Sequence, residues 1–385
     1  MLVSRPWRVV AALIVASLLA APGVRAQRRG DDKKDQGKQD QSKLSDAQRQ
    51  ELAPLVRTVD EVMKTGTAGT FSVTVAKDGN ATVAAAPDAV PLTWKNDFLK
   101  ATNNLIYVPF VVTLEPGKMG SSVAGYLRVT PKGATAPVAP AAGDKKDDKK
   151  KDAKDAAANY PFEDVYFVDL RAPAAGQPLR LTRAFAVPTG SYDVYLALRE
   201  HATGGQAADA AVKIAVMKQE LTVPNYWASE FTTSSLILAD KVEPLNAPLS
   251  PEAQRERPYV LGSTEIVPAS DNKFKKTEEL GVIFQVYGYQ LGSDKKPDVQ
   301  IEYMFHQKDA SGGEKPFNKT EPQKFNAQTL PASFDPEQGH QIVGGQMIPL
   351  ASFPEGDFRL EIKITDNKAS KTINREVLFS VVPAS

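Results

Sequence analysis

The amino-acid sequence predicts an all-β protein built from two β-sandwiches in tandem. From Gly69 onward, short runs rich in Val, Ile, Tyr, Phe and Thr alternate with turns rich in Gly, Pro, Asn and Asp. This pattern is typical of strands joined by short turns. Seven or eight such runs are followed by seven more, with no helical segment between the two series. Two series of short strands predict two sandwiches.

Residues 1–26 are predicted to be a secretory signal peptide. Arg5 and Arg8 give a positive start, residues 9–21 are small or apolar, and Ala26 places a small residue just before the expected cut. The apolar run is 13 residues long, whereas a membrane-spanning helix needs roughly 20. An uncleaved anchor is the alternative. Cleavage after Ala26 would send the protein to the periplasm or outside the cell, and no later stretch is apolar enough to span a bilayer.

Two further segments precede the strands. Residues 27–43 mix both charges without one apolar side chain, so we expect a disordered leader. Residues 44–66 predict an amphipathic helix that Gly66 can end. Pro54 either kinks this helix or marks its true first turn. Six apolar residues at spacings of three and four form its buried face: Leu52, Leu55, Val56, Val59, Val62 and Met63.

The first predicted sandwich spans residues 67–223 and carries an insertion at residues 131–159. The insertion begins with Ala and Pro, and six lysines then meet five aspartates between Asp144 and Asp155. Such a run is expected to be a disordered, solvated loop and not part of a core.

The second predicted sandwich spans residues 224–385. Its clearest strand shows a period of two, with apolar side chains on one face and polar side chains on the other. The apolar set is Val299, Ile301, Tyr303 and Phe305, and the polar set is Gln300, Glu302 and His306.

Two similar segments, residues 187–195 and 353–361, support a repeated architecture. Each has a Pro-x-Gly turn, then an aromatic residue and an alternating strand. This pattern is also a common hairpin signal. It resembles the end of an immunoglobulin-like or fibronectin-type sandwich, which implies two immunoglobulin-like domains. The family implies a Tyr hydroxyl bonded to a nearby backbone group; Tyr192 fits, while Phe358 could keep only the packing.

A second resemblance rests on four short stretches. Residues 92–100 and 107–110 look like the start of a group of uncharacterised exported bacterial proteins. Residues 234–239 and 353–360 are similar to the β-sandwich regions that accompany GWxTD domains in secreted proteins. No Gly-Trp-x-Thr-Asp motif occurs in this sequence. The resemblance implies an all-β exported protein and brings no catalytic residue with it.

Composition and motifs exclude several function classes. The net charge of +1 favours neither nucleic acid nor anionic lipid. The absence of cysteine removes disulfides, thiolate catalysis and thiolate metal sites. His201, His306 and His340 are far apart in the sequence, so we predict no metal site. A nucleophilic serine motif is lacking, and the Ser-x-x-Lys match at Ser270 is a chance occurrence. We therefore predict no catalytic residue and no cofactor.

Tyr226 and Trp227 are the candidate ligand or partner contacts, in the segment that joins the two strand series. Trp227 could stack on a sugar or anchor a partner. The alternative is that it seals a domain junction, because tryptophan is usually well buried. Trp94 lies among apolar residues and is predicted to belong to the core.

These observations favour an exported, non-catalytic interaction or scaffold protein of the bacterial envelope, with a protein or glycan partner. A carbohydrate-binding module is one alternative. An envelope hydrolase whose site is assembled only in three dimensions is another.

Overall fold

The computed structural model confirms the all-β prediction. It describes residues 44–75, 81–134, 160–172, 177–201, 211–309 and 311–384. Within these residues strands dominate, and the only α-helices are α1 (Asp46–Thr65) and α2 (Pro251–Glu256). The predicted signal peptide, the leader and most of the insertion lie outside the described residues. No helix among the described residues is long and apolar enough to cross a membrane.

The chain divides into two compact units. Among the described residues, the N-terminal unit comprises 44–96 and 101–224, and the C-terminal unit comprises 97–100 and 225–385. The four residues Asp97–Lys100, which include β4 (Leu99–Lys100), thus lie within the first strand series but group with the second unit.

The N-terminal unit contains two antiparallel sheets. Sheet A has the strand order β2-β1-β10-β9-β6-β7. In sheet B, β3 and β8 lie on either side of β5. The strand bounds are β1 (Gly69–Val75), β2 (Ala81–Ala85), β3 (Leu92–Asn96), β5 (Leu105–Leu114), β6 (Ser122–Pro131), β7 (Phe162–Asp169), β8 (Leu179–Pro188), β9 (Gly190–Glu200) and β10 (Val212–Val223).

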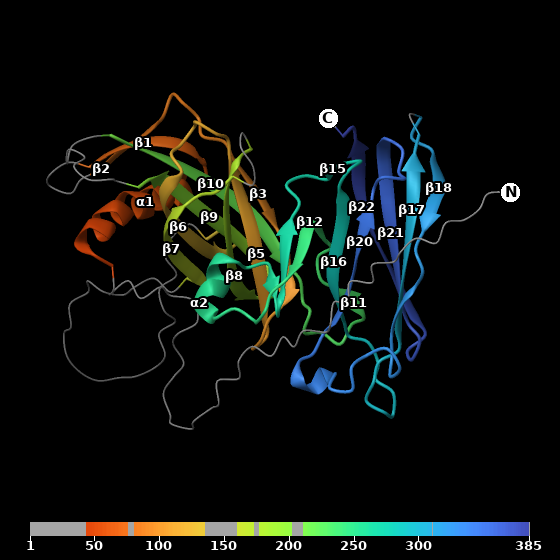
Figure 1. The fold of residues 1–385 in the computed structure, drawn as a ribbon. Coiled ribbons are helices and arrows are strands. Elements are labelled where there is room, and N and C mark those ends of the chain that lie inside the picture. The colour runs from red at the N-terminus through yellow and green to blue at the C-terminus, as the bar shows by residue number, and fades with distance from the viewer. Residues whose placement is uncertain are drawn as a thin grey trace, which may run out of the picture. The chain divides into compact units, whose positions relative to one another are not determined.

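Helix α1 covers one face of sheet A and forms a third layer (Figure 1). The apolar stripe of the helix, including Leu55, Val59 and Val62, packs on side chains of the sheet such as Val73 and Ala197. The opposite face of sheet A packs on sheet B. The rings of Phe162 and Phe185 lie 5.7 Å apart across these two sheets, and the Arg183 guanidinium lies 5.4 Å from the Tyr166 ring. The unit is therefore a helix–sheet–sheet stack.

Local chemistry fixes the ends of α1. The Ser45 hydroxyl accepts a hydrogen bond from the backbone N–H of Gln48, and the Gln48 side chain accepts one from Ser45. This reciprocal pair satisfies two donors at the start of the helix. Gly66, at φ +73°, ends the helix and donates its N–H to the Val62 carbonyl. Pro54 lies inside the helix, which rules out its placement in the first turn.

The C-terminal unit has two sheets that share one core. In sheet C, β16 pairs with β20 on one side and with β11 and β12 on the other, and β14 and β13 follow beyond β12. Sheet D has the order β15-β22-β21-β17, with β18 and β19 both pairing with β17. Only the β15–β22 pair is parallel among the strand pairs of the described unit.

The strand bounds of this unit are β11 (Thr232–Thr233), β12 (Ile237–Pro244), β13 (Val260–Leu261), β14 (Thr264–Pro268), β15 (Lys273–Lys275), β16 (Glu279–Tyr287), β17 (Val299–Lys308), β18 (Glu314–Lys319), β19 (Gln323–Phe325), β20 (Ile342–Pro349), β21 (Gly356–Asp366) and β22 (Lys371–Val382). A short 3₁₀ turn, η2, covers Pro336–Gln338.

The predicted alternation of β17 is confirmed, because its four apolar residues are buried in the core that both sheets share. The two aromatic residues of the repeated segments make different contacts. The Tyr192 hydroxyl donates a hydrogen bond of 3.0 Å to the Pro188 carbonyl. Phe358 has no hydroxyl and stacks on Phe379, with 5.3 Å between ring centroids.

We predict that Gly288→Ala destabilises the C-terminal unit much more than Gly339→Ala. Both glycines have positive φ, +66° and +89°, which costs a non-glycine residue about 1–2 kcal/mol. A methyl group at Gly288 would also lie 2.0 Å from the Glu230 carbonyl oxygen, whereas nothing lies within 4 Å at Gly339. We expect a loss of about 3 kcal/mol or more at Gly288 and about 1 kcal/mol at Gly339. Urea unfolding measures both values, and equal losses would contradict this account.

Candidate interaction surfaces

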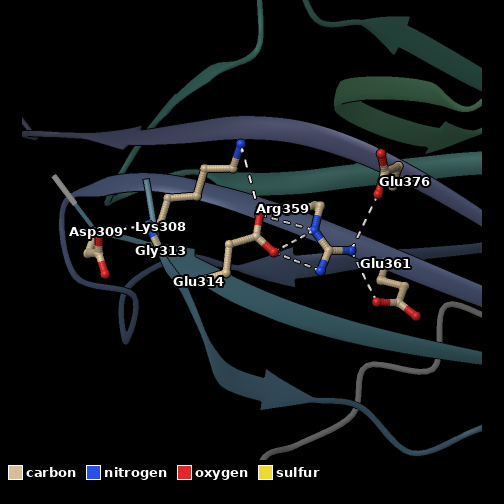
Figure 2. Close-up of polar contacts among 7 residues, drawn as sticks. All are labelled: Lys308, Asp309, Gly313, Glu314, Arg359, Glu361 and Glu376. Carbon is tan, nitrogen blue, oxygen red and sulfur yellow. Dashed lines mark hydrogen bonds and ion pairs between the residues drawn. The ribbon is translucent and has the colours of Figure 1, made fainter. Parts of the chain in front are cut away.

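The outer face of sheet D carries a connected set of charged side chains (Figure 2). These side chains alternate with the core residues of β17, β21 and β22, so they point away from the shared core. We call the following residues the sheet D face: Glu302, Met304 and His306 of β17, Arg359, Glu361 and Lys363 of β21, and Asn374, Glu376 and Leu378 of β22.

Arg359 is the centre of the sheet D face. Its Nη2 lies 2.8 Å from Glu314 of β18, and its Nη1 lies 3.1 Å from Glu361 and 3.4 Å from Glu376. Its Nε donates to the same Glu314 carboxylate at 2.9 Å. One guanidinium thus joins three strands, and Lys308 lies 3.9 Å from Glu314 as a weaker fifth member.

These contacts change the acidity of the groups involved. Hydrogen bonds from Arg359 lower the pKa of the Glu314 carboxyl, and nearby positive charge acts in the same direction. The same hydrogen bonds raise the pKa of Arg359. The contacts with Glu314, Glu361 and Glu376 hold the guanidinium in one orientation on the sheet D face.

An apolar side chain lies beside this charged centre. Leu378 is opposite Arg359 in the strand register and is 50% exposed. Among the described residues, the only other large apolar side chain that is exposed is Trp227. Glu376, two residues before Leu378 on the same strand face, has a side chain that is 68% exposed. The surface therefore offers one apolar anchor with fixed charges of both signs around it.

The outer face of sheet A presents the opposite case, because α1 fills it. Arg128 of β6 is only 3% exposed. Its Nη1 pairs with Asp60 of α1, and its guanidinium lies 4.1 Å from the Tyr160 ring. Nearer the start of the helix, Arg199 Nη2 lies 3.8 Å from Glu51 of α1. Cations on this sheet face are thus neutralised by acids of the helix.

The three histidines of the sequence lie at separate places. His201 Nδ1 is 2.8 Å from Glu51, and His306 Nε2 is 3.3 Å from Glu361. His340 Nδ1 accepts a hydrogen bond from a backbone N–H. No group of three or more His, Cys, Asp and Glu side chains that could hold a metal ion is present in the described part of the chain.

The structure gives different environments to the two residues that the sequence analysis singled out. Tyr226 is 8% exposed and packs against Tyr287, with ring centroids 4.9 Å apart; burial raises its pKa to about 12. Trp227 is 37% exposed, and Lys100 Nζ lies 4.2 Å from its ring centroid. Sequence reasoning missed Lys100 and Arg359, because folding brings Lys100 to Trp227 and Arg359 to Glu314 from distant parts of the chain. Trp94 stacks on Phe110 in the N-terminal unit.

Comparisons with known proteins yield little. No family model and no curated protein matches the chain. A solved structure named pT26-6p is similar to it at 7% sequence identity and a TM-score of 0.19, over 77% of this chain and 67% of that one. A likeness this weak supports no inference about fold or function, so the surfaces are interpreted from their own geometry.

We predict that Arg359→Met raises the pKa of the Glu314 carboxyl toward its ordinary value, because the hydrogen bonds that lower it most are lost. A carboxylate whose pKa is lowered by folding stabilises the folded state above its unfolded pKa, and this contribution is lost as the pH falls through the folded pKa. The variant should therefore lose less stability than the parent when the pH is lowered.

Carboxyl NMR titration of the two proteins measures this effect. Asp335 is the internal control, because its pKa is lowered by Gln338 and by backbone N–H groups of η2 that the substitution leaves in place. A Glu314 pKa that does not move in Arg359→Met would contradict the assigned cause.

Proposed function

We propose that this chain is an exported, non-catalytic interaction protein of the bacterial envelope that binds a protein partner through the sheet D face. The observation that carries this proposal is the exposed Leu378 beside a guanidinium already fixed by three carboxylates. Interfaces commonly depend on a few apolar anchors, and fixed charges around the anchor give orientation and selectivity.

The contrast between the two outer sheet faces supports this assignment. On sheet A, the chain places its own helix over the face and neutralises Arg128 and Arg199 with helix acids. On the sheet D face, charges are paired with one another and Leu378 remains exposed. A surface that satisfies its own charges costs little to keep in water, and charges on a complementary partner can offset the desolvation of these groups in an interface.

The mixture of charges favours a protein over nucleic acid as the partner. Arg359 and Lys363 are accompanied by Glu302, Glu361 and Glu376, so the face lacks the positive excess that phosphate backbones require. A protein surface that carries both charges and one apolar cavity would be complementary to the sheet D face.

An immunoglobulin-like relationship for the C-terminal unit belongs to the same proposal. One sheet contains β12-β16-β20 and the other β15-β22-β21-β17-β18, an arrangement close to the two sheets of that sandwich. The kinship with β-sandwich regions of GWxTD-containing secreted proteins, suggested by residues 234–239 and 353–360, is likewise proposed.

The proposal of export rests on the sequence features of residues 1–26. The mass of the chain recovered from the envelope would locate the cleavage site.

In-cell photo-crosslinking tests the proposed surface. A photoreactive amino acid at Leu378 is expected to give a discrete covalent adduct in the envelope, because this side chain would lie in the centre of the interface. The matched control is the same amino acid at Ala351, which is exposed in the turn before β21. Adding Arg359→Met should reduce the Leu378 adduct at least fivefold, since the fixed charge is lost.

The control position defines the contrary outcome. Absence of an adduct at Leu378, or adducts of equal yield at Leu378 and Ala351, would reject this face as the binding surface.

A further inference from the structure

A second surface of the C-terminal unit combines a cation with an exposed aromatic ring. Lys100 Nζ lies 4.2 Å from the centroid of the Trp227 ring and 5.9 Å from that of Tyr287. Trp227 is 37% exposed, while Tyr287 is buried beneath the pair. Lys100 is half-buried, and neither Lys100 nor Trp227 belongs to the sheet D face.

The segment that carries Lys100 is held in place by side chains of the same unit. The Lys100 N–H donates to the Tyr287 hydroxyl at 2.9 Å. Two residues earlier, the Phe98 N–H donates to the Ser235 hydroxyl at 2.9 Å. The Tyr287 hydroxyl in turn donates to the buried Gln285 amide at 2.6 Å. The ammonium group is therefore presented from a fixed backbone, as a preorganised site requires.

The charge of Lys100 is not matched by an acid. Within the described residues, its Nζ forms no ion pair with a carboxylate and lies over the rings of Trp227 and Tyr287. Burial lowers the pKa of Lys100. A ring face attracts an ammonium but does not use all three of its N–H donors. Donors thus remain for an anion that approaches Trp227.

The turn around Trp227 is also fixed. The side-chain oxygen of Asn225 accepts hydrogen bonds from the N–H groups of Trp227 and Ala228, at 3.0 and 3.2 Å. These bonds fix the backbone of the turn that carries the indole. The part of the ring that Lys100 Nζ does not cover can take the C–H groups of a sugar against the aromatic system.

We infer that Lys100 and Trp227 bind a sugar ring that carries an acidic group. The sugar ring lies against the part of the indole that Lys100 Nζ leaves uncovered, and the carboxylate or phosphate pairs with Lys100 Nζ. An aromatic surface alone would serve neutral sugars, but the unmatched ammonium selects the acidic ones. This inference goes beyond the proposed protein-binding function and does not depend on it.

Titration calorimetry on the exported chain at low salt tests the inference with two acidic probes, trigalacturonic acid and glucose 6-phosphate. Glucose and neutral galactotriose are the matched neutral probes. At least one acidic probe is expected to bind at least tenfold more tightly than its neutral counterpart. The acidic probe that binds identifies the source of the charge.

Substitutions assign the binding to this site. Lys100→Gln should weaken the acidic probe about tenfold, while Lys100→Arg retains most of the affinity. Trp227→Ala should weaken it by tenfold or more, and Trp227→Phe should do so less. Lys324→Gln, at an exposed lysine of β19, is the matched control and should bind as the parent does. A thermal unfolding curve for each variant checks that folding is intact.

Three results would overturn the inference. One is that no acidic probe binds the parent chain. Another is that acidic and neutral probes bind equally well. The third is that folded Lys100→Gln binds the acidic probe as tightly as Lys324→Gln.

Discussion

Within the described residues, the structure depends on which faces of its four sheets are buried. The chain has no cysteine, so no disulfide restrains either unit and apolar burial has to hold the folded state. In the C-terminal unit, Phe284, Ile301 and Phe358 come from different strands and meet in one core between sheets C and D. Each such side chain contributes roughly 2 kcal/mol when buried, whereas an exposed ion pair contributes at most ~1 kcal/mol. The core therefore stabilises this unit, and the charges on the sheet D face add little to its stability.

The N-terminal unit meets the same constraint with a third layer. Sheet A is apolar on both sides, so one face packs on sheet B and the other requires α1. The buried Arg128 and Arg199 at the helix interface would be costly if unpaired, and Asp60 and Glu51 of α1 neutralise them. Because a buried ion pair adds little net stability, we interpret these pairs as fixing the position of α1 along the sheet. The apolar stripe supplies the free energy of docking.

Sequence patterns predicted the elements better than their arrangement. The sequence shows a period of two in β17 and the helical spacing of Leu55, Val59 and Val62 in α1. Both patterns follow directly from side-chain geometry, so both elements could be predicted. The helix layer was not predicted, although a signal for it exists. Residues 123–130 and 192–199 are buried on both strand faces, and such runs indicate a sheet covered on two sides. The sandwich interpretation accounted for only one covered face.

The candidate surfaces were harder to predict for a different reason. Trp227 stands out in the sequence as an unusual residue in a connecting segment. Lys100 does not, since nothing in its neighbourhood indicates that β4 groups with the C-terminal unit. The partners of Arg359 depend on strand register, which places Glu314 and Glu376 beside it from two other strands. Register is a property of the folded sheet and is only weakly specified on a polar face.

The central claim is that the chain covers sheet A with its own helix and leaves the sheet D face for another molecule. Carbodiimide footprinting of carboxylates, on the purified chain and on the chain in intact envelopes, measures this most directly. The account predicts that Glu376 and Glu302 react in the purified chain and are protected in the envelope, while the exposed Glu355 reacts equally in both. Equal reactivity of Glu376 in both states would contradict the claim.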